Sequence, residues 1–361
     1  MNSAYFYRQL YQWWEHNKRE LPWRETEDGY RIWLSEIILQ QTRVQQGMEY
    51  YHHFIERWPT VADLAKAGEQ EVLREWQGLG YYSRARNLHK AARQIVESAP
   101  RQGTKAECQS LFPRTFEEIR ALPGVGDYTA GAIASFAYNM PYPAIDGNVY
   151  RVVARLKDCA EPFDSSSGKK LFHRYIDEML DRTNPRLFNS AIMEFGALYC
   201  TPSLTDSETG ACVCERCVIK EVCKGYAHHT AGLLPVRKPR PTLRDRYLNY
   251  RIYLSGEKGA LHTLIHQRKE KDIWQHLWEF VLEESEQGVL PVKGQTRFVD
   301  INHVLSHQRL HTRFSVLYVE QLPSIEGYRA VPLASLDEYG MSRLTLKALD
   351  QLRATAGLRP L

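Results

Sequence analysis

The chain has 361 residues, of which 43% are hydrophobic and 25% are charged, and its formal net charge is +4. This length leaves room for two domains with substantial cores, and the composition is that of a globular protein rather than a disordered one. No apolar run approaches the roughly 18 residues that a membrane span needs. The mild basic excess permits a nucleic-acid partner without requiring one.

The first 224 residues carry mainly helical patterns. The N-terminus is amphipathic and lacks the pattern of a secretory signal, so we expect the protein in the cytoplasm. Residues 100–114, which include Cys108, are expected to form an irregular loop. Apolar residues at helical spacing predict helices over 5–17, 33–46, 50–57, 61–67, 69–77, 83–97, 115–122, 149–156, 169–180 and 185–198.

Residues 122–152 (LPGVGDYTAGAIASFAYNMPYPAIDGNVYRV) contain a glycine turn followed by two helix starts. Gly124 and Gly126 lie in the turn, and glycine lets a backbone come close to a ligand because it has no Cβ atom. The free N–H groups and the dipole at the start of the next helix suit a phosphate. Asp146 heads the second helix, where local sequence alone would make it an N-cap.

The composition changes at residues 225–246, where three prolines and a basic excess predict an extended linker. Period-two alternation follows over 248–254 and 312–318, as is typical of strands. Helices expected at 333–339 and 342–355 complete a separate α+β domain over 247–361.

Five of the seven cysteines lie between Cys200 and Cys223. In a cytoplasmic protein such a group is expected to bind a metal rather than to form disulfides. Thiolates select zinc or an iron–sulfur cluster, and the spacing of Cys214, Cys217 and Cys223 leaves both open.

Several motifs, in order along the chain, resemble those of the MutY-type adenine DNA glycosylases in the helix–hairpin–helix superfamily, to which endonuclease III also belongs. They are LPWR, SEIILQQTRV, GLGYYSRARNL, LPGVGDYTAGAI, DGNVYRV and Cys-x2-Cys-x5-Cys. The resemblance covers 5–224 and, more weakly, 247–318. It implies a mainly α helix–hairpin–helix glycosylase domain over 1–224 and a C-terminal α+β Nudix-like domain over 247–361.

The resemblance also implies a [4Fe-4S] cluster in the loop 200–223, held by Cys200, Cys214, Cys217 and Cys223. Thirteen residues separate Cys200 from Cys214, more than the family usually has. We expect this longer loop to bulge and its additional Cys212 to lie off the cluster.

Four residues acquire catalytic roles from the same resemblance. Glu36 would protonate adenine at N7 and later handle the attacking water. Asp146 would stabilise the cation that forms on the sugar, with Tyr128 and Asn148 assisting. This division of roles is like that between the two carboxylates of glycosidases. The apolar residues around Glu36 in the sequence suit a raised pKa.

Further positions match residues with which the family binds DNA. Base flipping requires side chains that fill the gap in the stack. Gly124 and Gly126 match the contacts to the DNA backbone, and Arg43, Arg84, Arg86 and Arg151 are expected to attract phosphates. Gln41 and Tyr81 match the residues that wedge into the stack, with Thr42 and Leu79 beside them, and Trp23 and Arg24 match the wall of the adenine pocket.

Two positions distinguish this chain within the superfamily. Tyr128 stands where endonuclease III-like enzymes carry the lysine that forms a Schiff base, so a monofunctional glycosylase is expected. Ser190 stands where the family usually has glutamine or glutamate in the adenine pocket, and Glu194, one helical turn on, is a candidate replacement.

The C-terminal half resembles the Nudix-like domain with which MutY-type enzymes recognise 8-oxoguanine. It lacks a Nudix box, so nucleotide hydrolysis is not expected. In HVLSHQRLH (303–311), Ser306 and His307 match the residues that contact the lesion. The three histidines of this stretch leave a second metal site as an alternative.

Together these features predict a monomeric glycosylase that removes adenine opposite 8-oxoguanine, and opposite guanine, from double-stranded DNA. In a bacterium it would be associated with the nucleoid. One alternative is a bifunctional endonuclease III-like glycosylase and AP lyase, which would cleave the strand. Another is a non-catalytic lesion-binding protein, which would bind the same duplex without releasing a base.

Overall fold

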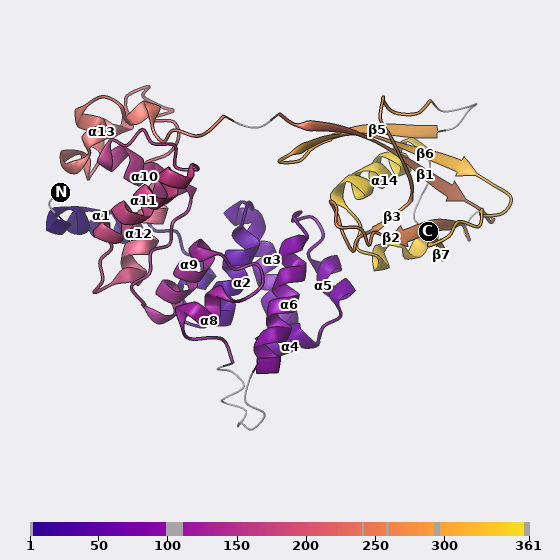
Figure 1. Ribbon diagram of the computed structural model, residues 1–361, viewed down its shortest axis with the longest axis horizontal. Coiled ribbons are helices and arrows are strands. Elements are labelled where there is room, and N and C mark those ends of the chain that lie inside the picture. Colours follow the sequence, from indigo (N-terminus) through magenta and orange to yellow (C-terminus); the bar gives the residue numbers. More distant parts are fainter. Residues whose placement is uncertain (1–2, 99–110, 240–241, 258–259, 292–296, 357–361) are drawn as a thin grey trace. The chain divides into compact units, whose positions relative to one another are not determined.

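The computed structural model describes residues 3–98, 111–239, 242–257, 260–291 and 297–356 (Figure 1). Cys108 and most of the predicted loop 100–114 lie outside these ranges. The chain forms two compact units: a helical unit of Met1–Ala65 and Lys90–Pro239, and a mixed unit of Lys66–His89 and Arg240–Leu361. Among the described helices, none combines the length and apolar character needed to cross a bilayer.

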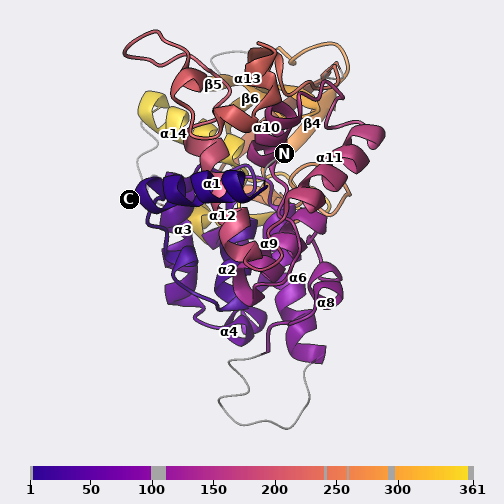
Figure 2. The ribbon, with the colours of Figure 1, turned by 90° about the vertical axis from the view of Figure 1, so that its left-hand side faces the viewer.

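The helical unit consists of short helices joined by tight turns. Both views show α1 beside α12 and α2 beside α9 (Figures 1 and 2). Its elements are α1 (Ser3–Asn17), η1 (Pro22–Arg24), α2 (Gly29–Leu39), α3 (Val44–Arg57), α4 (Val61–Lys66), the end of α6 (Ser83–Ser98), α8 (Phe116–Arg120), α9 (Asp127–Tyr138), α10 (Gly147–Lys157), α11 (Ser166–Met179), α12 (Pro185–Leu198), η2 (Val213–Arg216), η3 (Lys220–Val222), α13 (Lys224–Ala227) and η4 (Ala231–Leu233).

Side-chain caps and a common core fix these helices. Asp28, Thr115, Asp146 and Ser165 each accept a hydrogen bond from a backbone N–H in the first turn of a helix. One core cluster joins α1, α10, α11 and α12 through fully buried side chains, which include Phe6, Phe172, Phe188 and Phe195.

The predicted glycine turn joins α8 to α9, which confirms the helix–hairpin–helix motif. Gly124 has a φ of 78°, a left-handed conformation that favours glycine. Gly126 precedes α9 with an ordinary φ of −96°. On α9, a Cβ atom on Gly131 would lie 2.2 Å from the carbonyl oxygen of Pro143, so α9 packs directly on the loop that leads to Asp146.

The prediction of a single helix over 33–46 is wrong, because α2 ends at Leu39 and α3 begins at Val44. Gln40 to Thr42 supply no apolar side chain to continue the buried face of α2, and Gln41 has a φ of 56°. The chain then folds back, and a Cβ atom on Gly47 would lie 2.7 Å from Leu39. Packing of α3 on α2 therefore overrides the local helical pattern.

The mixed unit contains two sheets and α14 (Arg343–Ala356). One sheet has the order β4 (Val281–Ser285), β1 (Arg244–Leu254), β6 (Gln308–Tyr318), β5 (Arg297–Val304), and the other has the order β3 (Trp278–Glu279), β2 (His262–Gln267), β7 (Arg329–Pro332). Strands β1 and β6 are parallel, and the other pairs are antiparallel. α14 covers one face of the larger sheet (Figure 1).

The predicted alternation is confirmed in β1, where Leu248, Tyr250, Ile252 and Leu254 are each 1% exposed. The mixed unit also contains η5 (Leu333–Glu338), α5 (Glu69–Glu75) and the start of α6. These last two elements come from residues 66–89, a segment within the range expected for the glycosylase domain.

The extended stretch is shorter than the linker predicted over 225–246. Residues up to Val236 pack on the helical unit: Leu234 is buried in its core, and the N–H of Phe163 donates to the carbonyl of Val236. β1 already begins at Arg244. The first half of the stretch packs because the sequence GLLPV supplies apolar side chains to bury. The prolines nearby led to the prediction of an extended linker instead.

Candidate active site

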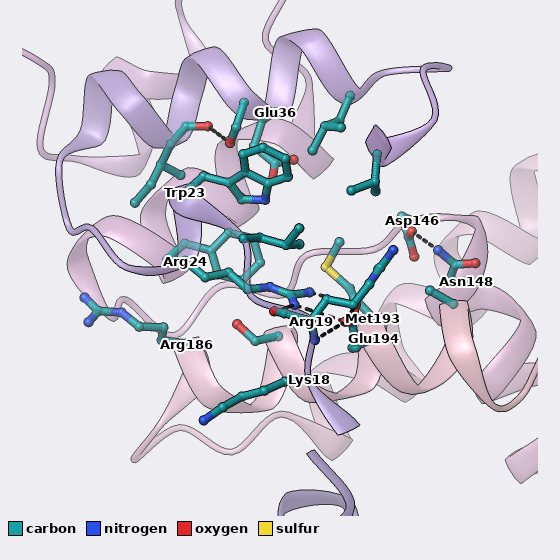
Figure 3. Close-up of a pocket in the computed structure, with 18 of the residues that line it drawn as sticks. Lys18, Arg19, Trp23, Arg24, Glu36, Asp146, Asn148, Arg186, Met193 and Glu194 are labelled. Carbon is teal, nitrogen blue, oxygen red and sulfur yellow. Dashed lines mark hydrogen bonds and ion pairs between the residues drawn. The ribbon is translucent and has the colours of Figure 1, made fainter. Parts of the chain in front are cut away.

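A cavity of about 940 Å³ opens in the helical unit (Figure 3). Its wall includes residues from η1, α2, α9, α10 and α12 and from the turn between α2 and α3. Glu36, Tyr128, Asp146 and Asn148 all line it. The structure thus brings together the four residues for which catalytic roles were predicted.

Glu36 lies on α2 and is 7% exposed. The hydroxyl of Tyr128 donates a hydrogen bond to its Oε2 at 2.8 Å. Burial raises the pKa of Glu36 to about 7, assisted by the nearby charge of Asp146 and opposed by the Tyr128 hydrogen bond and by Arg24. At neutral pH the carboxyl group therefore retains its proton in a substantial fraction of molecules.

Asp146 caps α10, as its position predicted. Its Oδ1 accepts from the N–H of Val149 at 2.8 Å, and its Oδ2 accepts from the amide of Asn148 at 2.7 Å. Burial raises the pKa of Asp146, while these hydrogen bonds and the charge of Arg151 oppose the rise. The hydrogen bonds favour the ionised form and fix the direction in which the carboxylate points.

Asn189 on α12 holds the loop that carries Asp146. Its side-chain oxygen accepts from the N–H of Ala144 at 3.1 Å, and its amide donates to the carbonyl of Tyr142 at 2.9 Å. Asn189 is fully buried, so these two backbone groups depend on it for their hydrogen bonds. Sequence reasoning missed this residue, because its partners lie 45 or more positions away.

An ion-pair cluster forms another part of the wall. Glu194 is 1% exposed and accepts from Arg19 at 2.8 and 2.5 Å and from Arg24 at 3.1 and 2.8 Å (Figure 3). Burial alone would raise the pKa of Glu194, but the hydrogen bonds from both arginines and the charge of Arg24 bring it down to about 2.

These contacts bear on the prediction that Glu194 replaces the glutamine or glutamate for which Ser190 stands. Ser190 and Glu194 both line the cavity, and both carboxylate oxygens of Glu194 accept hydrogen bonds from Arg19 and Arg24. Arg19 was not predicted. The signal was available, since an acid on the apolar face of α12 requires a cationic partner.

Trp23, Arg24, Gln41 and Thr42 also line the cavity. The break after α2 places the last two there. Trp23 is buried and packs edge-on against Tyr51, with ring centroids 5.2 Å apart.

Four other predicted contact residues belong to the mixed unit. Tyr81 is 49% exposed, whereas Leu79 is only 8% exposed. Ser306 and His307 are exposed in the turn between β5 and β6, with Oγ of Ser306 3.2 Å from Nδ1 of His307.

Three of the four arginines expected to attract phosphates have internal roles. Arg84 is 8% exposed and donates to the carbonyls of residues 79 and 80. Arg86 donates to the carbonyl of Gln275, and Arg151 donates to the carbonyls of residues 196 and 200. Arg43 is exposed, as a phosphate contact requires.

The four predicted cluster ligands, Cys200, Cys214, Cys217 and Cys223, line one small cavity in the helical unit. In the described ranges, no three His, Cys, Asp or Glu side chains converge as the ligands of a single metal ion must. Cys212 is exposed on the longer loop, which pairs residue 205 with residue 212.

Arg155 lies beside the four cysteines and is 2% exposed. Its guanidinium donates to Sγ of Cys200 at 3.2 Å and to the carbonyls of Thr201, Ala231 and Leu234. The guanidinium of Arg155 thus donates to carbonyl groups and to that sulfur. A buried cation with such partners fits an anionic group at the cysteines.

The three histidines of 303–311 do not form a metal site. His303 and His311 lie on opposite faces of the β5–β6 pair, since residues 303 and 310 are paired and residues 302 and 311 are paired. His311 contacts Asp245 and Asn302, whereas His307 lies in the turn. The alternation of a strand separates side chains that the sequence places close together.

Comparisons with known proteins concern both units. Residues 34–173 match the family described as HhH-GPD superfamily base excision DNA repair protein, and residues 253–351 match the NUDIX domain family. The chain is 31% identical to the adenine DNA glycosylase of Mus musculus over 385 residues, which cover 88% of this chain and 72% of the mouse protein.

Two further similarities extend this result. The adenine DNA glycosylase of Buchnera aphidicola subsp. Baizongia pistaciae is 31% identical over 326 residues, which cover 86% of this chain and 85% of that protein. Among solved structures, a thermostable thymine-DNA glycosylase is 25% identical with a TM-score of 0.53, covering 63% of this chain and 97% of its own.

Proposed function

The chain belongs to the adenine DNA glycosylase family, and we propose that it hydrolyses the N-glycosidic bond of adenine paired with 8-oxoguanine or guanine in duplex DNA. The observation that supports this most is the shared cavity of Glu36 and Asp146, in which burial raises the pKa of Glu36 to about 7. One carboxyl group is thereby suited to give a proton and the other to face a cation.

The reaction begins with an adenine flipped into the cavity. The protonated carboxyl of Glu36 transfers its proton to N7 of the base. The glycosidic bond then breaks, its electron pair leaves with adenine, and positive charge develops on the sugar. Glu36 is left as a carboxylate, which the hydroxyl of Tyr128 stabilises by its hydrogen bond.

Asp146 stabilises the sugar cation. Its carboxylate is held in one orientation by the N–H of Val149 and the amide of Asn148, so little reorganisation is needed when the positive charge appears. Water then adds to C1′, and its proton passes to the Glu36 carboxylate. The products are free adenine and an abasic site, and the enzyme regains its starting protonation state.

The same wall supports a monofunctional reaction. Tyr128 cannot form a Schiff base with the opened sugar. Among the described residues that line the cavity, the one lysine is Lys18. Its ammonium group pairs with Glu15 at 2.9 Å. We therefore propose that the DNA strand stays intact after adenine is released.

Recognition of 8-oxoguanine is assigned to Ser306 and His307. They are exposed at the turn of the β5–β6 hairpin, where hydroxyl and imidazole groups can bond to a purine edge. In this proposal Gln41 and Tyr81 enter the base stack. The backbone at Gly124 and Gly126 contacts phosphates.

We further propose that Cys200, Cys214, Cys217 and Cys223 hold a [4Fe-4S] cluster, with Cys212 off the cluster. The shared cavity of the four thiols and the buried Arg155 beside them support an anionic cluster. Bound there, the group would cross-link the loop 200–223. Zinc is the alternative, and analysis of iron, sulfide and zinc in purified protein distinguishes the two.

The decisive experiment incubates the protein with duplexes that carry adenine opposite 8-oxoguanine, guanine, cytosine or thymine, followed by alkali. The wild type is expected to release adenine opposite the first two, with strand breaks only after alkali. Glu36→Gln and Asp146→Asn are expected to bind the same duplexes without releasing base.

Other outcomes would identify other functions. Strand breaks without alkali, together with borohydride trapping of the wild type, would indicate a lyase. Tight binding without base release by the wild type would indicate a lesion-binding protein.

A further inference from the structure

The turn formed by residues 78–81 presents Tyr81 to solvent. Tyr81 has a φ of 47°, which is unusual for a residue with a side chain. The buried guanidinium of Arg84 fixes the backbone of this turn, because it donates to the carbonyls of Leu79 and Gly80 at 3.2 Å. The same guanidinium lies 5.9 Å from the centroid of the Tyr81 ring. The guanidinium also lies 5.0 Å from the centroid of the Trp76 ring, and the indole N–H of Trp76 donates to the carbonyl of Gly80. The 78–81 turn is thus strained but firmly held.

Two hydrogen bonds tie this turn and Tyr82, the residue that follows it, to residues near the C-terminal end of the mixed unit. The guanidinium of Arg343 donates to the carbonyl of Gly78 at 3.1 Å. The hydroxyl of Tyr82, a residue only 4% exposed, donates to the carbonyl of Met341 at 3.0 Å. The second bond joins residues that are 259 positions apart in the chain.

The helix before the turn is held in the same way. Nδ1 of His276 lies 2.6 Å from Glu69 on α5, and the indole N–H of Trp278 donates to Gln70 at 3.1 Å. A Cβ atom on Gly340 would lie 3.5 Å from Leu73, which is ordinary van der Waals contact. Segment 66–89 therefore packs on the mixed unit along its length.

Met341 and Arg343, which bond to Tyr82 and Gly78, are also connected to the hairpin that carries Ser306 and His307. Met341 forms a bridge with Trp278 of β3, and Ser342 caps α14 by accepting from the N–H of Thr345. Arg343 is the first residue of α14, which packs on β5. Burial lowers the pKa of His303 on β5, and the charges of Lys347 and Arg343 on α14 lower it further.

We propose that Tyr82 and Arg343 are positioning residues that connect the 78–81 turn to the β5–β6 hairpin, so that the base opposite adenine governs insertion of Tyr81. The inference rests on the proposed function. A purine seated against Ser306 and His307 is linked to the Tyr81 ring through β5, the start of α14 and the 78–81 turn. The extent to which Tyr81 inserts into the base stack then depends on whether 8-oxoguanine or guanine lies opposite adenine.

The expected size of the effect follows from the two bonds. One hydrogen bond contributes about 1 kcal/mol, which corresponds to about fivefold in an equilibrium constant. Loss of the Arg343 bond is expected to reduce the ratio of adenine-release rates, 8-oxoguanine pair over guanine pair, by about fivefold. Loss of both bonds is expected to reduce it by about tenfold or more.

The test compares Tyr82→Phe, Arg343→Gln and the double variant with the wild-type full-length protein. Single-turnover adenine release is measured on 8-oxoguanine:adenine and guanine:adenine duplexes. A 2-aminopurine placed beside the opposite base reports insertion of Tyr81 through its fluorescence. Arg353→Gln is the matched control, because Arg353 is also exposed on α14 but pairs with Asp350. Arg343→Lys, which keeps a donor, is the conservative variant.

The proposal expects a smaller rate ratio and a weaker fluorescence rise in the double variant, partial recovery in Arg343→Lys, and no change in Arg353→Gln. An unchanged ratio and fluorescence in the double variant would overturn it. An equal loss of rate on both duplexes would also overturn it, since this indicates a merely structural role. Failure of the wild type to release adenine would instead refute the proposed function, and the fluorescence comparison would still test the connection.

Discussion

In the proposed mechanism, Glu36 couples the chemistry of the cavity to pH. Burial raises its pKa to about 7, so the proton donor is present below that pH and is lost as the pH rises through it. Above about pH 7, single-turnover adenine release is expected to fall about tenfold per pH unit. On the acid side the rate is expected to fall as Asp146, whose pKa burial also raises, becomes protonated. A flat profile from about pH 5 to about pH 9 would contradict these roles.

Glu194 is expected to influence the pKa of Glu36 through Arg24. Its carboxylate neutralises Arg24, a residue whose charge lowers the pKa of Glu36. In Glu194→Gln that positive charge is no longer compensated, so the pKa of Glu36 is expected to fall and the alkaline limb of the profile to move to lower pH. Removing one member of this buried cluster is also expected to destabilise the fold by about 3 kcal/mol.

The measurement is the pH–rate profile of Glu194→Gln together with its thermal unfolding. Arg182→Gln is a suitable control, because Arg182 forms an exposed pair with Asp177. An alkaline limb that stays in place while stability falls would mean that Glu194 acts only on the fold.

At the scale of residues, sequence motifs predicted which side chains line the cavity but not what surrounds them. Glu36, Tyr128, Asp146 and Asn148 lie within motifs that a single sequence displays. The contact between Arg19 and Glu194 joins residues 175 positions apart, and no local pattern records such a pairing. Burial, which decides the pKa values, likewise arises only on folding.

The two glycines that bracket the start of α9 have different tasks. A Cβ atom on Gly126 would meet nothing within 4 Å, so Gly126→Ala is expected to change the free energy of unfolding by less than about 0.5 kcal/mol. If this backbone approaches a phosphate, the same methyl group is expected to weaken duplex binding about tenfold. Unchanged binding would remove Gly126 from the proposed DNA contacts.

Gly131→Ala is the matched comparison, since its Cβ atom would lie 2.2 Å from the carbonyl oxygen of Pro143. It is expected to destabilise the fold by about 2 kcal/mol or more, because backbone cannot move aside easily. Thermal unfolding and fluorescence anisotropy with a labelled duplex measure both variants.

The loop 200–223 depends on Arg155 of α10. Arg155→Met keeps much of the side-chain volume but removes the charge beside Cys200 and the donors to the carbonyls of Ala231 and Leu234. It is expected to lower the iron content per chain and the visible absorbance of the purified protein, and to cost about 2–4 kcal/mol in stability. Arg174→Gln, an exposed site on α11, is the control. Full iron content in Arg155→Met would contradict the role of its charge.

Elements were predictable where one face is buried continuously. The alternation in β1 and the glycine turn before α9 each follow from local chemistry. The break between α2 and α3 does not, because it depends on where α3 finds a surface to pack on. The same is true of residues 225–236, whose prolines indicated a linker although their apolar side chains bury against distant helices.

Over the whole molecule, the chain is divided by packing rather than by order along the sequence. Segment 66–89 belongs to the mixed unit, although composition changes only at residue 225. Composition describes only the residues of a segment itself. The residues that bond to segment 66–89 lie more than 180 positions further along the chain. Sequence patterns alone therefore do not indicate this arrangement.

A truncation after residue 239 tests this division. It removes the partners of Glu69, Gln70 and Tyr82, so amide hydrogens of residues 69–86 are expected to exchange at least tenfold faster than in the full chain. Exchange in α9 and α10 should remain slow, since their contacts lie in the helical unit. Equal protection of residues 69–86 in both proteins would show that this segment does not need its C-terminal partners.

The pairing of residues 82 and 341 also bears on biosynthesis. During translation, α5 and the start of α6 emerge from the ribosome before residues 276, 278, 341 and 343, which form hydrogen bonds with this part of the chain, have been made. Leu73, which is fully buried and lies beside Gly340 in the finished protein, is synthesised long before that neighbour. The parallel pairing of β1 with β6 delays folding of the mixed unit further, because β6 is complete only when the chain has reached residue 318. A nascent chain stalled before that point should be a preferred client of ribosome-associated chaperones.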